Sequence, residues 1–119
     1  MVQFVPAGEF VKFTQSETVA TGDAVAVDSN GEVVKASSDN EDRMPAIGFV
    51  KTVRSSYCIV QLTYIVEKTG LSTGSQYWVG TNGSITNTVP GNGNTIQKVG
   101  KAISSTKLLL NIESQTITL

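Results

Sequence analysis

Apolar and polar residues alternate over much of this chain with the two-residue period that is typical of β-strands. The clearest example is AVAVDSNGEVVK at positions 24–35, in which two runs rich in Val and Ala flank a cluster of turn residues. Asn and Gly tolerate the positive φ angles of tight turns, so this segment predicts a β-hairpin that turns at Asn30-Gly31. The segment SSYCIVQLTYIVEK at 55–68 predicts the longest strand, with a bend within it.

A second hairpin is predicted at 73–88, where TGSQYWVGTNGSITNT repeats the order of residues found in the first and turns at Asn82-Gly83. A shift of 52 residues aligns the two segments without a gap. The aligned pairs are Thr21-Gly22 with Thr73-Gly74, Gly31 with Gly83, and Ile47-Gly48 with Val99-Gly100. A deletion of two residues then aligns CIVQL (58–62) with LLLNI (108–112). The sequence therefore predicts a pseudo-repeat of residues 21–62 and 73–112. The alternative is that turn and strand rules alone make any two hairpins look alike.

These features together predict an all-β fold, a small β-barrel or sandwich built from two similar hairpin-containing units with an extended N-terminal segment. Isolated hairpins are marginally stable in water, so each unit needs the other to bury its apolar face. At 119 residues the chain has the size of one domain, and residues 19–119 are expected to form it. No segment predicts a helix of more than a turn or two, because Pro45 interrupts the best candidate.

The N-terminal segment, residues 1–18, is predicted to be either an arm or an edge strand. Pro6 argues against a central strand, because proline cannot donate to the ladder. The segment precedes the first copy of the pseudo-repeat, so its apolar side chains are candidates for contact with a partner. These candidates are Phe4, Val5, Phe10 and Phe13. An arm predicts that removal of residues 2–13 leaves the thermal midpoint nearly unchanged. In the alternative, the phenylalanines plug one end of the molecule's own barrel.

Trp78 is the remaining candidate for contact with a partner. The alignment places Tyr77 and Val79 where Val25 and Val27 stand, and Trp78 where the first copy has alanine. If the two valines face the core, Trp78 points the other way, into solvent or toward a neighbour. The alternative is a buried tryptophan that the N-terminal segment covers.

Composition narrows the kinds of catalysis and binding that this chain could carry out. The chain has no histidine, which removes the commonest general base and metal ligand. The net charge is −1, so no basic footprint for nucleic acid is visible, and no apolar run reaches the length of a membrane span. Cys58, the only cysteine, shares a strand face with apolar residues and is expected to be buried and inert. No catalytic residue, metal site or cofactor is predicted.

Three loops match ligand-binding motifs only in part. DSNGE at 28–32 has the composition of a calcium-loop fragment but lacks the later bidentate Glu, and it is also ordinary for a hairpin turn. SDNED at 38–42 gathers three carboxylates and is expected to be a solvated loop. GNGNT at 91–95 is not followed by the helix that a phosphate-binding loop requires.

The order of these motifs resembles the small head-decoration, or cement, proteins of tailed bacteriophages. The likeness rests on TGDAVAVDSNGEVVKA, PAIGFV, CIVQLTYIVEK, GLSTGSQYWVG and VGKAISSTKLLLNI, and it covers residues 19–112. Each motif is short, so their order and spacing carry the likeness. Similar cassettes occur inside phage tail-fibre proteins.

The resemblance implies a non-enzymatic virion protein that binds the outer surface of the assembled capsid after synthesis in the host cytoplasm. The implied partners are the major capsid protein and further copies of the chain, as a trimer or dimer, with no nucleic acid, membrane or cofactor. The N-terminal segment of such proteins commonly contacts the capsid. The alternatives are a tail-fibre or adhesin module and, ranked third, a small carbohydrate-binding β domain.

Overall fold

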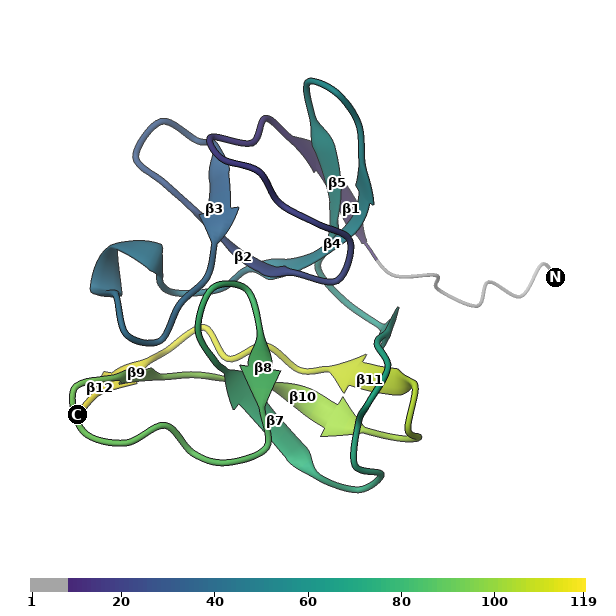
Figure 1. The fold of residues 1–119 in the computed structure, drawn as a ribbon, viewed down its shortest axis with the longest axis vertical. Helices are drawn as coiled ribbons and strands as arrows, with labels where there is room; N and C mark the ends of the chain where they lie inside the picture. The colour runs from purple at the N-terminus through teal and green to yellow at the C-terminus, as the bar shows by residue number, and fades with distance from the viewer. Residues whose placement is uncertain (1–8) are drawn as a thin grey trace, which may run out of the picture.

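A computed structural model describes residues 9–119, which form twelve strands and one short 3-10 helix (Figure 1). The predicted all-β fold is confirmed. Two five-stranded antiparallel sheets lie one above the other, and a two-stranded antiparallel sheet completes the fold (Figure 1).

Each large sheet is built from one half of the chain. The first contains β1 (Phe10–Phe13), β2 (Ala24–Val27), β3 (Val33–Lys35), β4 (Gly48–Val53) and β5 (Cys58–Gln61), in the order β1-β5-β4-β2-β3. The second contains β6 (Ile65–Glu67), β7 (Gln76–Val79), β8 (Ile85–Thr86), β10 (Lys98–Ala102) and β11 (Lys107–Leu110), in the order β6-β11-β10-β7-β8. The small sheet pairs β9 (Thr95–Ile96) with β12 (Ile117–Thr118). The 3-10 helix, Glu41–Arg43, lies between β3 and β4.

Both predicted hairpins form. In the second, Asn82 and Gly83 have φ angles of 51° and 84°, and Ser84 N donates to the Thr81 carbonyl oxygen across the turn at 3.0 Å. Two successive residues with positive φ give the turn the twist that matches the flanking strands. The first hairpin has a longer loop, in which Gly31 N donates to the Asp28 carbonyl oxygen at 3.1 Å. This turn centres on Ser29-Asn30, one residue before the predicted Asn30-Gly31, and Gly31 follows it with a φ of 78°.

The two large sheets share one topology. In each, the first strand along the chain pairs with the last, and the second and third strands form the hairpin at the opposite edge. The matching pairs are Ala26–Val34 with Trp78–Thr86, and Val25–Gly48 with Tyr77–Gly100. Both sets keep the offset of 52 residues, so the aligned positions are equivalent in their backbone pairing.

The closing strands follow a different offset from the predicted one. Phe49 pairs with Gln61 and Lys101 pairs with Leu109, so β5 and β11 are offset by 48 residues rather than 50. The register of the first pair shifts after Val50, and this bulge, together with a longer loop, extends the first β4–β5 hairpin. The predicted alignment of 58–62 with 108–112 is therefore wrong by two positions.

The segment predicted as one long strand is two strands in different sheets. β5 ends at Gln61 in the first sheet, and β6 begins at Ile65 in the second. Tyr64 lies between them with a φ of 82°, a left-handed conformation that interrupts the extended backbone. The side-chain amide of Gln61 donates to the carbonyl oxygens of Thr63, at 2.9 Å, and Ile65, at 2.8 Å, and so holds the crossing in place.

β1 has in the first sheet the place that β6 has in the second. Phe10 pairs with Gln61, and Ile65 pairs with Leu109, at the same position of the two closing strands. The repeat therefore begins near residue 10 rather than at 21. The prediction that the N-terminal segment precedes the repeated unit is wrong for residues 10–13, because these residues form an edge strand of the first copy.

The first sheet closes on itself. The chain that leaves β1 reaches β3 at the opposite edge, where Val33 N donates to the Thr14 carbonyl oxygen at 2.9 Å and Ser16 N donates to the Val33 carbonyl oxygen at 3.1 Å. The enclosed core contains Val19, Val25, Val33, Val50, Cys58 and Val60, with Phe13 packed against it. The N-terminal segment thus helps to close the first unit.

A second core lies between the sheets. It contains Ala24, Ala26, Val34, Ala36 and Phe49 from the first half of the chain and Val66, Tyr77, Val79, Val99, Ala102 and Leu108 from the second. The alanines are small enough to let the second sheet approach closely. By the offset of 52, Tyr77 and Val79 correspond to Val25 and Val27, not to the alanines. The two copies therefore stack head to tail, which means that the face of the first sheet at the seam is not the face that the second sheet presents there.

We expect Gly48→Ala and Gly100→Ala to destabilise the protein strongly. A Cβ atom at either glycine would overlap the carbonyl oxygen of the neighbouring strand, on Gln61 and Leu109 respectively. Overpacking against a rigid backbone costs about 1–3 kcal/mol or more. Thermal unfolding should show midpoints lowered by several degrees, whereas Gly91→Ala, with open space around it, should unfold like the parent. Equal midpoints for the three variants would contradict the close strand approach.

Candidate functional site

The N-terminal candidates fall into two groups. Phe4 and Val5 lie outside the described residues. Phe10 and Phe13 lie in β1, where Phe13 packs against the enclosed core and Phe10 is 42% exposed. Of the two interpretations of the N-terminal segment, residues 10–13 fit the edge strand that helps to cover the molecule's own core.

β1 has a free edge in the described part of the chain. It pairs with β5 on one side and ends the strand order of the first sheet. Phe10 is 42% exposed and Val11 is 38% exposed on this strand, and Lys12 Nζ lies 4.6 Å from the ring centre of Tyr57. An edge strand presents unpaired backbone groups on which another strand can pair. The edge combines such groups with apolar side chains, so it is a candidate contact surface.

Trp78 lies on the opposite face of its strand from the core, as the sequence predicts. Tyr77 and Val79 are buried between the sheets, whereas Trp78 is partly exposed on the outer face of the second sheet. Its cross-strand neighbours are Lys98 and Thr86. The described part of the N-terminal segment lies in the first sheet and does not cover this face. Trp78 and Phe10 therefore belong to two separate surfaces.

Asp28 stabilises the first hairpin turn. Its Oδ1 accepts hydrogen bonds from the backbone N–H groups of Asn30, at 2.9 Å, and Glu32, at 3.0 Å. The Glu32 N–H lowers the pKa of Asp28 most, burial opposes this in part, and Asn30 and the Ser16 hydroxyl lower the pKa further. The carboxylate of the predicted calcium-like fragment is thus used by the turn itself.

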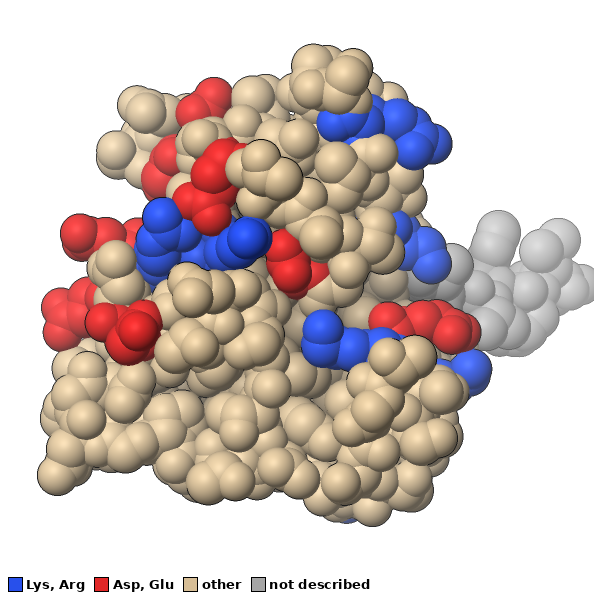
Figure 2. Space-filling model, in the orientation of Figure 1, with Lys and Arg blue, Asp and Glu red and all other residues tan. Residues whose placement is uncertain are grey.

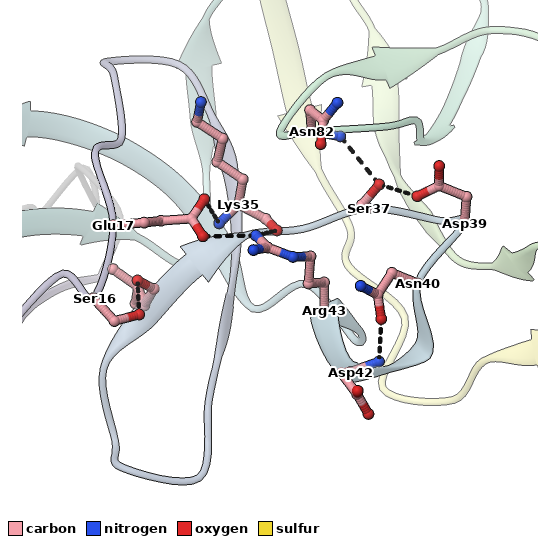
Figure 3. Close-up of polar contacts among 10 residues, drawn as sticks. Ser16, Glu17, Lys35, Ser37, Asp39, Asn40, Asp42, Arg43 and Asn82 are labelled. Atoms are coloured by element: carbon pink, nitrogen blue, oxygen red, sulfur yellow. Dashed lines mark hydrogen bonds and ion pairs between the residues drawn. The ribbon is translucent and has the colours of Figure 1, made fainter.

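The acidic loop at 38–42 is tied down by its own side chains (Figure 3). Ser37 Oγ donates to Asp39, and it accepts from the backbone N of Asn82, in the second hairpin, at 3.2 Å. Asn40 caps the 3-10 helix by accepting from Asp42 N at 3.0 Å. Among residues 9–119, no group of three or more acidic or cysteine side chains is placed to hold a metal ion.

An ion pair joins the C-terminal end of this loop, at Arg43, to the segment between β1 and β2 (Figure 3). The guanidinium of Arg43 lies 2.8 Å from a carboxylate oxygen of Glu17 and donates to the Lys35 carbonyl oxygen at 3.3 Å. Glu17 also accepts from Lys35 N at 3.4 Å. Both charged groups are partly exposed, so the pair contributes only modestly to stability.

Gln97 is a structural residue that sequence reasoning missed. Its side chain is 1% exposed, and its amide forms two bonds with one residue of the first half: Oε1 accepts from Ala46 N at 2.7 Å, and Nε2 donates to the Ala46 carbonyl oxygen at 2.9 Å. Nε2 also donates to the Glu113 carbonyl oxygen at 2.8 Å. A glutamine within a polar stretch gives no sequence signal of this role.

The second hairpin adds backbone bonds across the same seam. Ala24 N donates to the Gly83 carbonyl oxygen at 2.9 Å, and Gly83 N donates to the Ala36 carbonyl oxygen at 2.7 Å. Ser38 N donates to the Gly80 carbonyl oxygen at 2.7 Å. The turn of the second copy is thus inserted into the hydrogen bonding of the first, and the two halves form one hydrogen-bonded unit.

An open cleft of about 380 Å³ lies where the halves meet, lined by Thr21, Gly22, Glu67, Lys68, Thr69 and Thr106. Lys68 Nζ donates to the Gly22 carbonyl oxygen at 3.0 Å. Burial lowers the pKa of Lys68, and the nearby Asp23 opposes the shift. The lysine therefore serves as a further tie between the halves. Cys58 is fully buried, as predicted, and burial raises the pKa of its thiol.

Comparison with known proteins adds no relative. No protein-family model matches the chain, and a search of curated proteins finds no match. In the described part of the chain no helix is long and apolar enough to cross a membrane.

We expect a stepwise truncation to separate the edge strand from the residues before it. A chain that begins at Glu9 keeps all four pairs between β1 and β5, whereas a chain that begins at Thr14 loses them and exposes the enclosed core. Relative to the first truncation, the second should lower the thermal midpoint by ten degrees or more, or prevent folding, since several kcal/mol of burial is lost (about 4 °C per kcal/mol). Equal midpoints would restore the interpretation of a free arm.

The role of Asp28 predicts a pH-dependent contribution to stability. Because folding lowers its pKa, the ionised carboxylate stabilises the fold above about pH 4, and this stabilisation is lost as the pH falls through the folded-state pKa. The difference in unfolding free energy between the parent and Asp28→Asn should therefore be larger at neutral pH than near pH 2. Asp42→Asn is the control, because the structure gives that carboxylate no hydrogen bond. A difference that is constant with pH for Asp28→Asn would contradict the assignment.

Proposed function

We propose that this chain is a non-enzymatic structural protein of a tailed-phage virion, which binds the outer surface of the assembled capsid and stabilises it. Its partners are the major capsid protein and further copies of itself, as a trimer or dimer. The order of sequence motifs that resembles phage head-decoration proteins points to this class. The surface that carries the proposal is the free edge of β1, on which Phe10 and Val11 are exposed.

The edge suits attachment by strand addition. A strand of the capsid protein that pairs with β1 gains main-chain hydrogen bonds, and Phe10 supplies an apolar contact beside them. The sequence just before β1 carries Phe4 and Val5, so further apolar side chains are available to the same partner.

The stacked halves suit a protein that reinforces a shell. Two hydrogen-bonded sheets joined by a buried seam resist deformation better than a single hairpin does. A protein that binds only the assembled shell stabilises that state by mass action, in proportion to the logarithm of its concentration relative to its dissociation constant. Such a role requires a rigid scaffold and a binding surface rather than a catalytic group.

A tail-fibre or adhesin module is the second candidate, and Trp78 is the observation that favours it. The tryptophan lies on the outer face of the second sheet beside Lys98, Thr86 and Gln76, where an aromatic surface flanked by polar groups can hold a ligand. A small carbohydrate-binding domain would use the same surface. In either case Trp78→Ala would abolish binding and Phe10→Asp would not.

We expect Phe10→Asp to weaken attachment to capsids. Heads of the encoding phage, assembled without this chain, are mixed with the purified protein and sedimented. The parent should sediment with the heads, and the variant should lose about tenfold or more in affinity, as when an interface aromatic worth about 2 kcal/mol is removed. Leu119→Asp is the matched control, because Leu119 is also exposed (54%) but lies at the C-terminus, on the other side of the molecule from β1 (Figure 1).

Thermal unfolding is measured in parallel, so that a loss of binding is not mistaken for a loss of folding. Binding by Phe10→Asp as tight as that of the parent would contradict the role of the β1 edge. Failure of the folded parent to bind heads would contradict the proposed function as a whole.

A further inference from the structure

Lys68 is a half-buried lysine that has no ion pair. Its Nζ donates one hydrogen bond at the cleft between the halves, to the Gly22 carbonyl oxygen at 3.0 Å. The three ion pairs among residues 9–119 do not include Lys68, and residues 1–8 contain no acidic residue. Burial lowers the pKa of Lys68, because water solvates its charge only in part. An ammonium group has three N–H donors, so two of them can bind a group in the cleft.

Threonine hydroxyls line the cleft beside this lysine. Thr21 comes from the first half of the chain, and Thr69 and Thr106 come from the second, so the cleft exists only where the halves meet. A hydroxyl can donate to an anion, as an ammonium group can. The cleft volume of about 380 Å³ is far larger than the roughly 10–15 Å³ that one water molecule requires, so the cleft can hold an organic ligand.

Two carboxylates limit the charge that a ligand of this cleft can carry. Glu67 lines the cleft, but its carboxylate pairs with Lys107 Nζ at 3.3 Å. Asp23 acts on Lys68 from beyond ion-pair distance, and its Oδ2 accepts from the backbone N of Ala20 at 2.8 Å. Neither carboxylate forms an ion pair with Lys68, yet both repel a ligand that carries two negative charges. A carboxylate ligand, with its single negative charge, therefore suits the cleft better than a phosphate dianion.

A smaller cavity with apolar walls adjoins the cleft. It has a volume of about 60 Å³, and Thr21 and Glu67 line both spaces. Its apolar walls come from Phe49, Val50 and Val66, which are buried in the two cores. Such walls offer water few hydrogen-bond partners, whereas an alkyl group in their place is removed from solvent. The shared residues let one ligand occupy the cleft and the cavity together.

We propose that the cleft binds a small aliphatic monocarboxylate. Lys68 donates to the carboxylate, the threonine hydroxyls donate beside it, and a short branched alkyl group fills the adjoining cavity. A free carboxylic acid and the C-terminal residue of a peptide both offer this chemistry. The residues that line the two spaces include neither Trp78 nor any residue of β1. This binding is therefore separate from the proposed attachment to the capsid.

Titration of the ¹⁵N-labelled parent with isovalerate, at constant ionic strength, tests the site directly. The amide signals of Gly22, Lys68, Thr69 and Thr106 should shift with one common dissociation constant in the millimolar range. Isovalerate should bind about tenfold more tightly than acetate, since each buried methylene contributes about fourfold in affinity. Equal affinities for the two acids, or shifts that do not saturate and are spread over the surface, would overturn the inference.

A lysine variant tests the role of the ammonium group. Lys68→Met should weaken the binding of isovalerate about tenfold or more, the loss expected for a hydrogen bond to a charged group. Basic side chains occur at several places on the surface, and any of them attracts anions (Figure 2). Lys101→Met is therefore the matched control, because Lys101 is exposed and lies outside the cleft, and it should bind like the parent. Equal affinity of the two variants would contradict the proposed site. The titration of the parent remains decisive if Lys68→Met, which loses its bond to Gly22, does not fold.

Two further ligands distinguish the sources of the carboxylate. N-acetylvaline presents its carboxylate and side chain as the last residue of a peptide does, and N-acetylvalinamide lacks the charge. Tighter binding of N-acetylvaline than of isovalerate assigns the site to a peptide C-terminus, and weaker binding assigns it to a free acid. Binding of the amide as tight as that of N-acetylvaline would refute recognition of a carboxylate. None of these outcomes alters the sedimentation of the parent with phage heads, so the inference can fail without the proposed function.

Discussion

The structure depends on the buried seam between its two copies. Each copy is a small sheet that cannot bury both of its faces, and the seam covers the alanine-rich face of the first with the apolar face of the second. Apolar contact alone would allow the sheets to slide. The amide of Gln97, bonded twice to the backbone of Ala46, and the peptide of Gly83, bonded to Ala24 and Ala36, fix one position. Directional bonds in a buried interface cost much to break, so the two halves should unfold together.

Head-to-tail stacking also explains why the copies differ. The positions that are Ala24, Ala26 and Phe49 in the first sheet are Gln76, Trp78 and Lys101 in the second. The first set must pack against another sheet, whereas the second set faces outward and ends the stack, like the polar capping repeat of a solenoid. The first copy likewise encloses its own inner core with residues 14–19. The second copy has a shorter connection between the corresponding strands, and its apolar face is covered by the first sheet instead. Trp78 is the exception on a polar face, which is why it remains a candidate contact.

The hairpin turns and the strands beside them were predictable from the local sequence. The turns at Gly31 and Gly83 require residues that accept positive φ, and this requirement is written in the sequence, as is the strand period around them. The break at Tyr64 is not written in the sequence, because a tyrosine between two apolar runs carries no glycine or proline signal for a left-handed residue. It is held by the side-chain amide of Gln61, which donates to the carbonyl oxygens of Thr63 and Ile65. The sequence also did not show that β1 belongs to the repeat, since its counterpart β6 has the same pairing but little similarity in sequence. For the candidate site, the outward direction of Trp78 followed from alternation, whereas the free edge of β1 required the sheet order.

The proposed function is tested most directly by an electron cryomicroscopy reconstruction of the virion of the encoding phage, compared with that of a mutant virion that lacks this chain. The account predicts density for two stacked sheets on the outer surface of the head, absent from the mutant, with the β1 edge against the shell and the outer face of the second sheet turned away from it. Difference density on the tail alone, or a head attachment through the Trp78 face, would contradict the account.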